Sequence, residues 1–372
     1  MAKHLNSVTD NRLADGNSAV SARVTIRDVA SAAGVSISTV SLYTQGRTGV
    51  SETTAARIAQ AIQQLGYVPR QGTQQRFNGA NANKGKERKG TKLFALLLEE
   101  MSLSAFPETL YGAIIKAMET EATRQGYNMI LSVIAQEGVP QIVTEGQVDG
   151  VVILGGCPLN DQVARQLAAH QIPLLLLDNY VVGAAIDAIV PDNEWGGYQA
   201  IQHLVGLGHR RIAIIEGPAK YKTLTDRLWG ALRAAHDLAI EIPRAYRPAP
   251  QSSGQPLKGY CETKTLLALS KPPTAIFAIS DKSAFGAMEA IREAGLRVPQ
   301  DISLIGFDNE VRAEHTSPPL TTLHLPKRQM GALAMQRLLG RIHDPLLPPV
   351  RTCLPVNLVV RDSTTVLAEN RL

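Results

Sequence analysis

Residues 25–47, TIRDVASAAGVSISTVSLYTQGR, indicate how the front of the chain folds. Its apolar residues recur at helical spacing and Gly34 interrupts them, which predicts two short helices joined by a tight turn. Thr25 can cap the first helix and Ser36 can cap the second. The stretch therefore has the spacing of a helix–turn–helix unit.

A third helix is expected to complete this front domain, residues 24–69. Ser51 can cap it, and Gly66 ends it. The apolar positions expected to form the three-helix core are Val29, Ala30, Val35, Val40, Ile58, Ile62 and Leu65. The polar residues 1–23 are predicted to be a disordered extension. Residues 70–91 are rich in Gly, Asn, Gln and Lys and are predicted to be a hinge or linker.

The charge of the chain is concentrated at its front. Residues 1–91 contain 12 Lys and Arg against 5 Asp and Glu, a net charge of +7, whereas residues 92–372 carry a net charge of −2. A basic front domain indicates an anionic partner, and a helix–turn–helix unit places its second helix in the major groove of DNA. Double-stranded DNA is therefore the expected partner of this domain.

The start of the second helix supplies the expected DNA contacts. The side chains predicted to face base edges are Ile37, Ser38 and Leu42. The side chains predicted to hold phosphates, through hydroxyls and helix N-termini, are Thr25, Ser36, Ser41 and Thr54.

The 372-residue length predicts two or three domains, and the rhythm of the sequence changes after Lys92. Short apolar strands then alternate with helical patterns, which indicates parallel sheets covered by helices on both faces. The expected strands are Leu93–Leu98, Tyr127–Val133, Val148–Leu154, Ile172–Leu177, Arg211–Glu216, Thr274–Ser280 and Ile302–Gly306. Two doubly wound lobes are predicted within residues 92–365. The expected first lobe is about 92–190 plus 322–345, the second is about 191–321 plus 346–365, and 366–372 is a tail.

The front domain resembles the DNA-binding headpiece of the lac repressor family, the LacI/GalR regulators. The matching blocks are VTIRDVASAAGVSISTVS, VSETTAARIAQAI and LGYVP, in that order within residues 24–69. Residues 92–365 resemble the family's effector-binding core, which is similar to periplasmic sugar-binding proteins. The matching stretches there include VDGVVIL, IPLLLLDN, VPDNEWGGYQAIQHLVGLGHRRIAII and SPPLTTLHLPKRQMG.

The resemblance implies a ligand-controlled transcriptional regulator, most often a repressor in this family. The implied effector is a small polar metabolite, such as a sugar, sugar acid or sugar phosphate, bound between the lobes. The implied effector-binding residues are Phe106, Asp178, Asp192, Tyr221, Thr223, Arg227, Asp281 and Asp308. Carboxylates and arginine suit hydroxyl groups on such a ligand. The alternative is that Asp192, Asp281 and Asp308 are helix caps or ion-pair partners.

Several positions depart from the family pattern. Leu42 stands where the family often has an arginine, so methyl contacts and DNA shape are expected to contribute to operator recognition. Arg76 stands where the hinge leucine is expected, with Phe77 beside it. Either Phe77 is a shifted wedge or Arg76 recognises a narrow minor groove. Lys222 and Lys327, together with the arginine of the site, suggest an anionic ligand as a further hypothesis.

No motif supports catalysis, so no catalytic residue, cofactor or metal is expected. The sequence GLGHRR, residues 206–211, is a poor dinucleotide fingerprint, and the chain has no phosphate-binding loop or nucleophile elbow. The three cysteines lie far apart, without the spacing of a zinc site or disulfide framework.

No apolar run approaches the roughly 18 residues of a membrane span, and no export signal is recognisable. A cytoplasmic protein is therefore expected. The chain end lacks the heptads of a tetramerisation helix, so a homodimer is expected. The alternatives are a solute-binding receptor without a DNA role, or a regulator that senses a nucleobase or a protein partner.

Overall fold

The computed structural model describes residues 25–44, 50–65, 90–99, 110–134, 138–250 and 259–367. The chain divides into two compact units, residues 1–82 and 83–372. The predicted N-terminal extension and most of the predicted linker lie outside the described residues. So do three predicted site residues, Arg76, Phe77 and Phe106.

The described residues of the front unit form the helices α1 (Ile26–Ala33), α2 (Ile37–Thr44) and α3 (Glu52–Leu65). At the start of α1, the Asp28 carboxylate accepts hydrogen bonds from the Thr25 backbone N–H and hydroxyl, both at 2.7 Å. Gly34 ends α1 with a φ of 61°, a left-handed conformation that glycine adopts readily. The predicted helix–turn–helix unit is present.

A small apolar core joins these helices. Val29, Val40 and Ile58, one from each helix, are fully buried. Leu65 was predicted to belong to this core, and that was wrong: it is the last residue of α3 and is 36% exposed. Leu65 continues the apolar face of α3, but at this end of the helix the described core no longer covers it.

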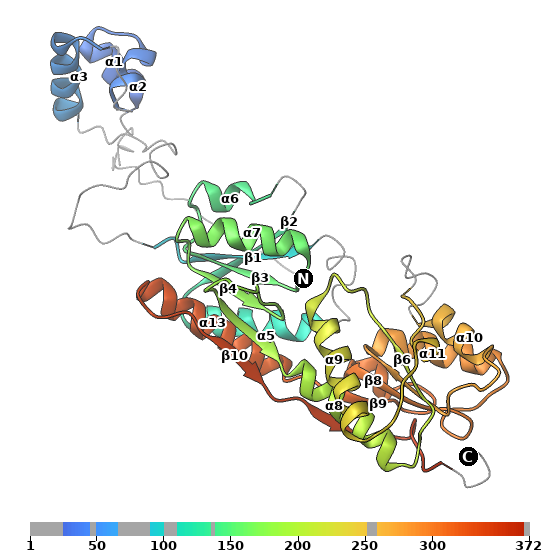
Figure 1. Ribbon diagram of the computed structural model, residues 1–372. Helices are drawn as coiled ribbons and strands as arrows, with labels where there is room; N and C mark the ends of the chain where they lie inside the picture. Colours follow the sequence, from blue (N-terminus) through green and yellow to red (C-terminus); the bar gives the residue numbers. More distant parts are fainter. Residues whose placement is uncertain are drawn as a thin grey trace, which may run out of the picture. The chain divides into compact units, whose positions relative to one another are not determined.

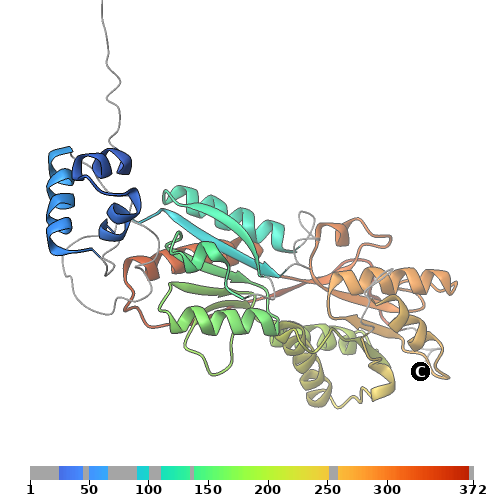
Figure 2. The ribbon, with the colours of Figure 1, turned by 90° about the horizontal axis from the view of Figure 1, so that it is seen from above.

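The second unit contains two sheets, one for each lobe (Figures 1 and 2). The first-lobe sheet has the order β10-β5-β4-β3-β1-β2, and all its strands pair in parallel. Its strands are β1 (Leu93–Glu99), β2 (Asn128–Ile134), β3 (Gly150–Leu154), β4 (Leu174–Leu177), β5 (Asp187–Pro191) and β10 (Arg351–Leu354). The second-lobe sheet has the order β11-β9-β8-β7-β6, with only β11 antiparallel. Its strands are β6 (Ile212–Ile215), β7 (Ala275–Ala278), β8 (Ser303–Asp308), β9 (Thr321–His324) and β11 (Asn357–Val359).

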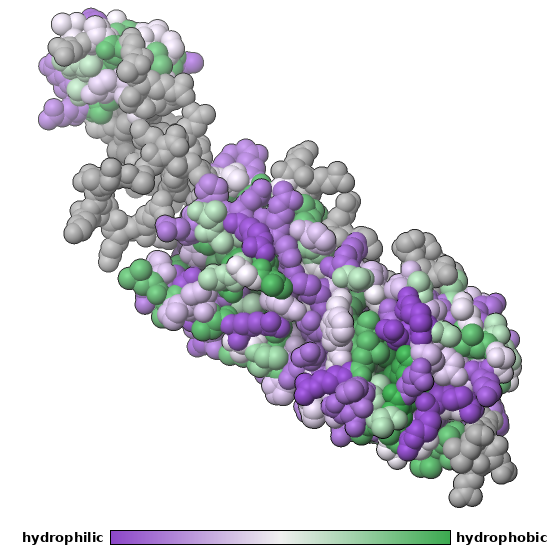
Figure 3. All heavy atoms as spheres, viewed as in Figure 1, coloured by the Kyte–Doolittle hydropathy of each residue, from purple (hydrophilic) through white to green (hydrophobic). Residues whose placement is uncertain are grey.

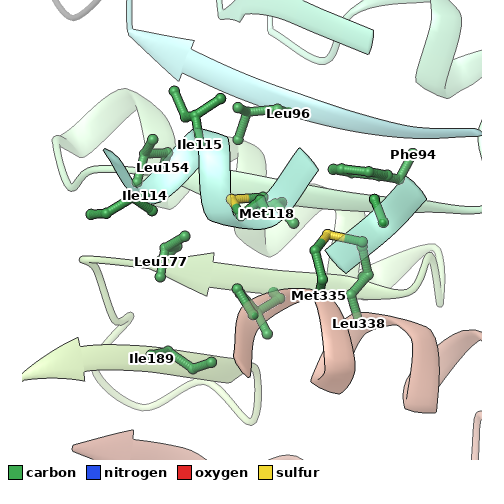
Figure 4. Close-up of a cluster of buried hydrophobic side chains, with 14 of the residues drawn as sticks. Phe94, Leu96, Ile114, Ile115, Met118, Leu154, Leu177, Ile189, Met335 and Leu338 are labelled. Atoms are coloured by element: carbon green, nitrogen blue, oxygen red, sulfur yellow. The ribbon is translucent and has the colours of Figure 1, made fainter. Parts of the chain in front are cut away.

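Helices cover both faces of each sheet, as the strand–helix alternation predicts. The first lobe has α5 (Leu110–Arg124), α6 (Gln141–Thr144), α7 (Pro158–Ala169) and α13 (Lys327–His343). The second lobe has α8 (Asn193–Gly206), α9 (Lys222–Asp237), η1 (Arg244–Tyr246), α10 (Tyr260–Leu267), α11 (Asp281–Glu293) and α12 (Val311–Glu314). Figure 4 shows the apolar layer in which Met118 of α5 and Met335 of α13 pack beneath the strands of the first lobe.

Among the residues that the structure describes, the chain crosses between the lobes within residues 191–193, 324–327 and 354–357. The predicted lobe bounds placed 322–345 in the first lobe and 346–365 in the second. The structure instead places β9 in the second-lobe sheet and β10 in the first-lobe sheet. Both late crossovers therefore come several residues later than predicted, because each follows a short strand that apolar patterning did not reveal.

A further strand that was not predicted, β5, begins with a buried charge. Asp187 is 1% exposed and accepts hydrogen bonds from Arg337 Nε at 2.7 Å and Val350 N at 2.9 Å. Arg341 Nε lies 3.2 Å from its second carboxylate oxygen. A buried carboxylate is tolerated only when it is paired in this way, which explains why the strand does not look like an apolar one.

The surface is mostly hydrophilic on the face seen in Figure 3, with hydrophobic patches between. The side chains of Trp195 and Trp229 are 47% and 60% exposed, so neither tryptophan belongs to the core. Among the residues that the structure describes, no helix has the length and apolarity needed to span a membrane.

A buried histidine fixes the end of the chain to the second lobe. His209 Nδ1 lies 3.0 Å from Thr274 Oγ1, and its Nε2 lies 3.1 Å from Ser303 Oγ and 3.0 Å from the Thr365 carbonyl oxygen. Burial lowers the pKa of His209 below its ordinary value of about 6.5. The folded protein therefore holds this imidazole neutral at pH values where the unfolded chain takes up a proton.

Replacing this histidine, His209→Ala, should lower the free energy of unfolding of the second lobe by roughly 2–4 kcal/mol, because three buried contacts are lost. The wild-type stability should also fall as the pH drops below about 6.5, and the variant should lose less over that range. Urea titrations at about pH 7.5 and about pH 5.5 measure both effects, with fluorescence of Trp195 and Trp229 as the signal. The exposed His236→Ala is the control, and equal pH dependence in wild type and His209→Ala would contradict the assignment.

Candidate functional site

The first turn of α2 is an exposed, hydroxyl-rich surface. Ser36 Oγ accepts a hydrogen bond from the Thr39 N–H at 3.1 Å and lies 2.7 Å from Ser38 Oγ. Ser36, Ile37 and Ser38 are all exposed, and Ile37 is 43% exposed although it is apolar. An exposed helix N-terminus with hydroxyls around it suits phosphate, and an apolar side chain there suits a thymine methyl.

The other predicted DNA-contact residues lie around this surface. Thr25 is exposed at the start of α1, while Ser41, Leu42 and Thr54 are half-buried. Thr54 Oγ1 accepts a hydrogen bond from Ser51 Oγ at 2.9 Å. Their DNA contacts remain predictions.

In the core unit, Arg227 is the centre of a buried polar cluster. It lies on α9, is 2% exposed and is one of the largest fully buried side chains of the described residues. Its Nε donates to Asn193 Oδ1 at 2.9 Å and its Nη1 donates to the Ile279 carbonyl oxygen at 2.9 Å. Nη1 also lies 2.9 Å from Asp308 Oδ1, and the guanidinium lies 3.8 Å from the Phe307 ring centre.

The first lobe contributes Asp178 to the surroundings of this arginine. Tyr111 Oη donates to Asp178 Oδ2 at 3.0 Å. Burial raises the pKa of Asp178 to about 6, against the positive charge of Arg227 and the Tyr111 hydrogen bond, which lower it. Asp178 has a φ of 53°, a left-handed conformation that costs free energy in a non-glycine residue.

Three buried polar atoms of this cluster have no hydrogen-bond partner within the described part of the chain: Asp308 Oδ1, Asp178 Oδ1 and Asn193 Nδ2. Asp308 Oδ1 lies 2.9 Å from Arg227 Nη1 and is therefore ion-paired, which leaves Asp178 Oδ1, an acceptor, and Asn193 Nδ2, a donor. Asp178 and Asn193 are 4% and 3% exposed. Buried polar atoms are almost always hydrogen-bonded, so a donor and an acceptor from outside the described chain would satisfy these two atoms.

The structure brings Asp178, Arg227 and Asp308 together. The other two predicted aspartates, Asp192 and Asp281, accept hydrogen bonds from residues of the protein. Asp192 caps α8, accepting from the Trp195 N–H at 3.0 Å. Asp281 accepts from the Glu310 N–H at 2.7 Å and from the Thr322 hydroxyl at 2.6 Å. Burial, followed by the neighbouring negative charge of Asp308, raises the pKa of Asp281 to about 8. The structure thus favours the structural alternative for Asp192 and Asp281, and the ion pair with Arg227 is the role that the same alternative gave to Asp308.

Thr223 and Tyr221 lie at the start of α9, where Thr223 is buried and Tyr221 half-buried. Tyr111 and Asn193 belong to the buried polar cluster but were not among the predicted site residues. Asn193 directly follows the predicted Asp192, and its role depends on α9 approaching α8. Tyr111 is an aromatic residue at the start of the first core helix, a signal that was available but was assigned to Phe106.

Two of the three cationic side chains behind the anionic-ligand hypothesis are ion-paired within the protein. Arg227 pairs with Asp308, and Lys222 Nζ lies 2.5 Å from Asp161 Oδ2. Lys327 Nζ donates to the neutral Asn309 carbonyl oxygen at 2.6 Å, a contact that does not balance its charge. This pairing weakens the basis of the hypothesis.

A cavity of about 490 Å³ lies elsewhere in the second lobe, between α11 and α12. Its lining includes Phe285, Arg292 and Arg312, with the Arg312 guanidinium 4.5 Å from the Phe285 ring centre. None of the predicted site residues lines it. The site is therefore assigned to the buried Asp178–Arg227 region, on the strength of its unpartnered polar atoms.

Removing the charge at the centre of the cluster, Arg227→Met, should lower the free energy of unfolding by roughly 3–5 kcal/mol, because Asp308 would be left buried without its counter-charge. Urea unfolding followed by tryptophan fluorescence measures the change. Arg233→Met is the matched control on the same helix. Arg233 is 70% exposed, and its pair with Asp237 at 3.9 Å should contribute no more than about 1 kcal/mol. Equal stability of the two variants would contradict the structural role of the buried pair.

Comparisons with known proteins agree with this arrangement. Residues 25–70 match the model of "Bacterial regulatory proteins, lacI family", and residues 201–364 match a periplasmic binding protein-like domain. The HTH-type transcriptional repressor PurR of Vibrio cholerae is 32% identical over 333 residues, which cover 86% of this chain and 92% of that protein.

Solved structures with the same fold include a complex of the transcriptional regulator CelR with cellobiose. It has a TM-score of 0.66 and 29% identity over 92% of this chain and 100% of that chain. The lac repressor dimer bound to operator and the anti-inducer ONPF has a TM-score of 0.64 and 29% identity, with the same coverage. The chain belongs to the lacI family of DNA-binding bacterial regulatory proteins.

Proposed function

We propose that this DNA-binding transcriptional repressor is controlled by an uncharged, hydroxyl-rich ligand held between Asp178 of the first lobe and Asn193 of the second. The observation that carries the proposal is the pair of buried, unpartnered atoms, Asp178 Oδ1 and Asn193 Nδ2. A sugar hydroxyl can donate to the carboxylate and accept from the amide. The Asp178 carboxylate makes the first of these bonds charge-assisted and therefore stronger.

The charge balance supports a neutral ligand over a sugar acid or sugar phosphate. An anionic group would meet Asp178 and Asp308 while the arginine between them is already paired. Burying a further negative charge there is costly. The bound cellobiose of the CelR complex is an uncharged sugar, which is consistent with this choice.

We further propose that two headpieces of a homodimer bind an operator with two-fold symmetry, since protein symmetry is mirrored in such sites. The lac repressor neighbour is described as an operator-bound dimer. Ile37 would contribute an apolar contact to a thymine methyl, with Ser36 and Ser38 placed around it at the start of α2. A solute-binding receptor without a DNA role would have no use for this exposed surface.

Operator recognition should depend on the apolar contact at the start of α2. Replacing Ile37 with alanine, Ile37→Ala, should weaken specific binding by about 1–3 kcal/mol while leaving binding to a scrambled duplex unchanged. Fluorescence polarisation on the protein's own upstream DNA measures both affinities and the number of chains per duplex. Replacing the contacted thymine with uracil should weaken wild-type binding and have little effect on Ile37→Ala.

The paired change Ser38→Ala with Ser41→Ala separates the repressor from the solute receptor. A repressor loses operator affinity but keeps its ligand affinity. Unchanged operator affinity in this variant would contradict the proposed DNA surface.

The two unpartnered atoms, Asp178 Oδ1 and Asn193 Nδ2, predict which class of ligand binds most tightly. Calorimetric titration with matched sugars, sugar acids, sugar phosphates and nucleobases should give the tightest binding with a neutral sugar. Asp178→Asn should weaken that binding about tenfold or more, because the charge-assisted bond is lost. Asp237→Asn, at the exposed end of α9, is the control. A sugar acid, sugar phosphate or nucleobase that binds more tightly than every neutral sugar would overturn the ligand class.

A further inference from the structure

The first turns of α9 contact the opposite lobe at two places. Lys222 Nζ lies 2.5 Å from Asp161 Oδ2, and Asp161 belongs to α7 of the first lobe. Tyr180, which follows β4, donates from its hydroxyl to Asp226 Oδ1 at 2.9 Å. Lys222 and Asp226 are four residues apart on one helix, so they lie on the same face. Both contacts therefore bridge the two lobes from one face of one helix.

The first-lobe partners of these bridges are linked to each other. Asn179 Nδ2 donates to Asp161 Oδ1 at 3.3 Å, while Asn179 Oδ1 accepts from the Tyr180 N–H at 2.8 Å. The Arg351 guanidinium, from β10, lies 3.6 Å from the Tyr180 ring centre, a cation–π distance. Asp161 and Tyr180 are thus held in place by their own lobe.

The bridging side chains are partly buried, which strengthens the electrostatic attraction between them. The side chains of Lys222 and Asp161 are 23% and 27% exposed, so salt screens this pair less than a fully exposed one. Burial raises the pKa of Asp226 above its ordinary value, which reflects the same partial removal from water. Both bridging charges of α9 have complementary partners. Lys222 pairs with the Asp161 carboxylate, and the Asp226 carboxylate accepts a hydrogen bond from the Tyr180 hydroxyl.

These contacts use none of the atoms proposed to bind ligand. The bridging atoms belong to Asp161, Tyr180, Lys222 and Asp226, whereas the unpartnered pair belongs to Asp178 and Asn193. The bridges can therefore form whether or not a ligand lies between the lobes. Their free energy adds to that of ligand binding and does not derive from it.

We propose that Lys222 and Asp226 of α9 form a latch with Asp161 and Tyr180 that holds the two lobes closed through the chain's own side chains. If the proposed function holds, the latch sets how much of the closing free energy a ligand has to supply. The population of closed lobes then depends on the latch first and on the ligand second.

The test measures lobe separation directly, so it needs neither the ligand nor the operator. Spin labels are placed at Ala168→Cys on α7 and Thr265→Cys on α10, both exposed positions, in the full chain with Cys261→Ser and Cys353→Ser. Labelled protein is diluted with unlabelled protein, so that the distances read by double electron–electron resonance are those within one chain.

Reversing the charge, Lys222→Glu, places two anions together and should shift the label distances from one short population to longer ones. The ratio of closed to open chains should fall about tenfold or more. Lys222→Glu combined with Asp161→Lys exchanges the pair and should restore the short distance. Tyr180→Phe, which keeps the ring over Arg351 and removes only the hydroxyl, should give an intermediate shift. Arg233→Glu, an exposed charge reversal on the same helix, should match wild type.

The exchange variant guards against general disruption of the fold. If Lys222→Glu keeps the wild-type distances, or if the exchanged pair stays as open as Lys222→Glu alone, the latch is overturned. Failure of the operator and calorimetric measurements would leave this result untouched, because the label distances report only on the lobes. The latch and the proposed function can therefore fail separately.

Discussion

The end of the second lobe that is proposed to face the ligand depends on the buried guanidinium of Arg227. It joins the start of α8, the end of β7 and the end of β8 through Asn193, the Ile279 carbonyl and Asp308. It reaches them because α8 and α9 cross at glycines. A Cβ atom at Gly197 would lie 1.9 Å from the Arg227 carbonyl oxygen, and one at Gly230 would lie 1.8 Å from the Glu194 carbonyl oxygen. Larger side chains at either position would separate the helices and withdraw the arginine.

This pairing also changes what the charges of the site can do. From the sequence alone, Arg227 looks like a positive charge that is available to a ligand. In the structure, Asp308 balances that charge inside the protein. What is left for a ligand is a carboxylate oxygen and an amide nitrogen, both buried. Such a pair selects for a donor and acceptor on one small molecule, and it disfavours a further negative charge.

Sequence patterning predicts the elements whose signal is local. The helix–turn–helix unit follows from Gly34 and its flanking apolar spacing, and the apolar central strands follow from runs such as Leu174–Leu177. It fails for β5, because the buried charge of Asp187 depends on arginines about 150 residues further along the chain. It also fails to separate Asp192, a helix cap, from Asp178, the residue proposed to bind ligand, since both follow a strand. Only tertiary contacts distinguish the two, and the same is true of Asn193.

The short crossovers between the lobes explain why side chains at the lobe interface strongly affect the balance between open and closed lobes. Each crossover is only a few residues long, so the sheets can rotate about these segments while each lobe stays intact. The apolar cores lie within the lobes and are little changed by such a rotation. The balance between open and closed lobes is then decided by a small number of polar contacts. A ligand can shift that balance by no more than its difference in affinity for the two arrangements. A latch built from Lys222 and Asp226 would lower that requirement, and with it the size of the response that a ligand can produce.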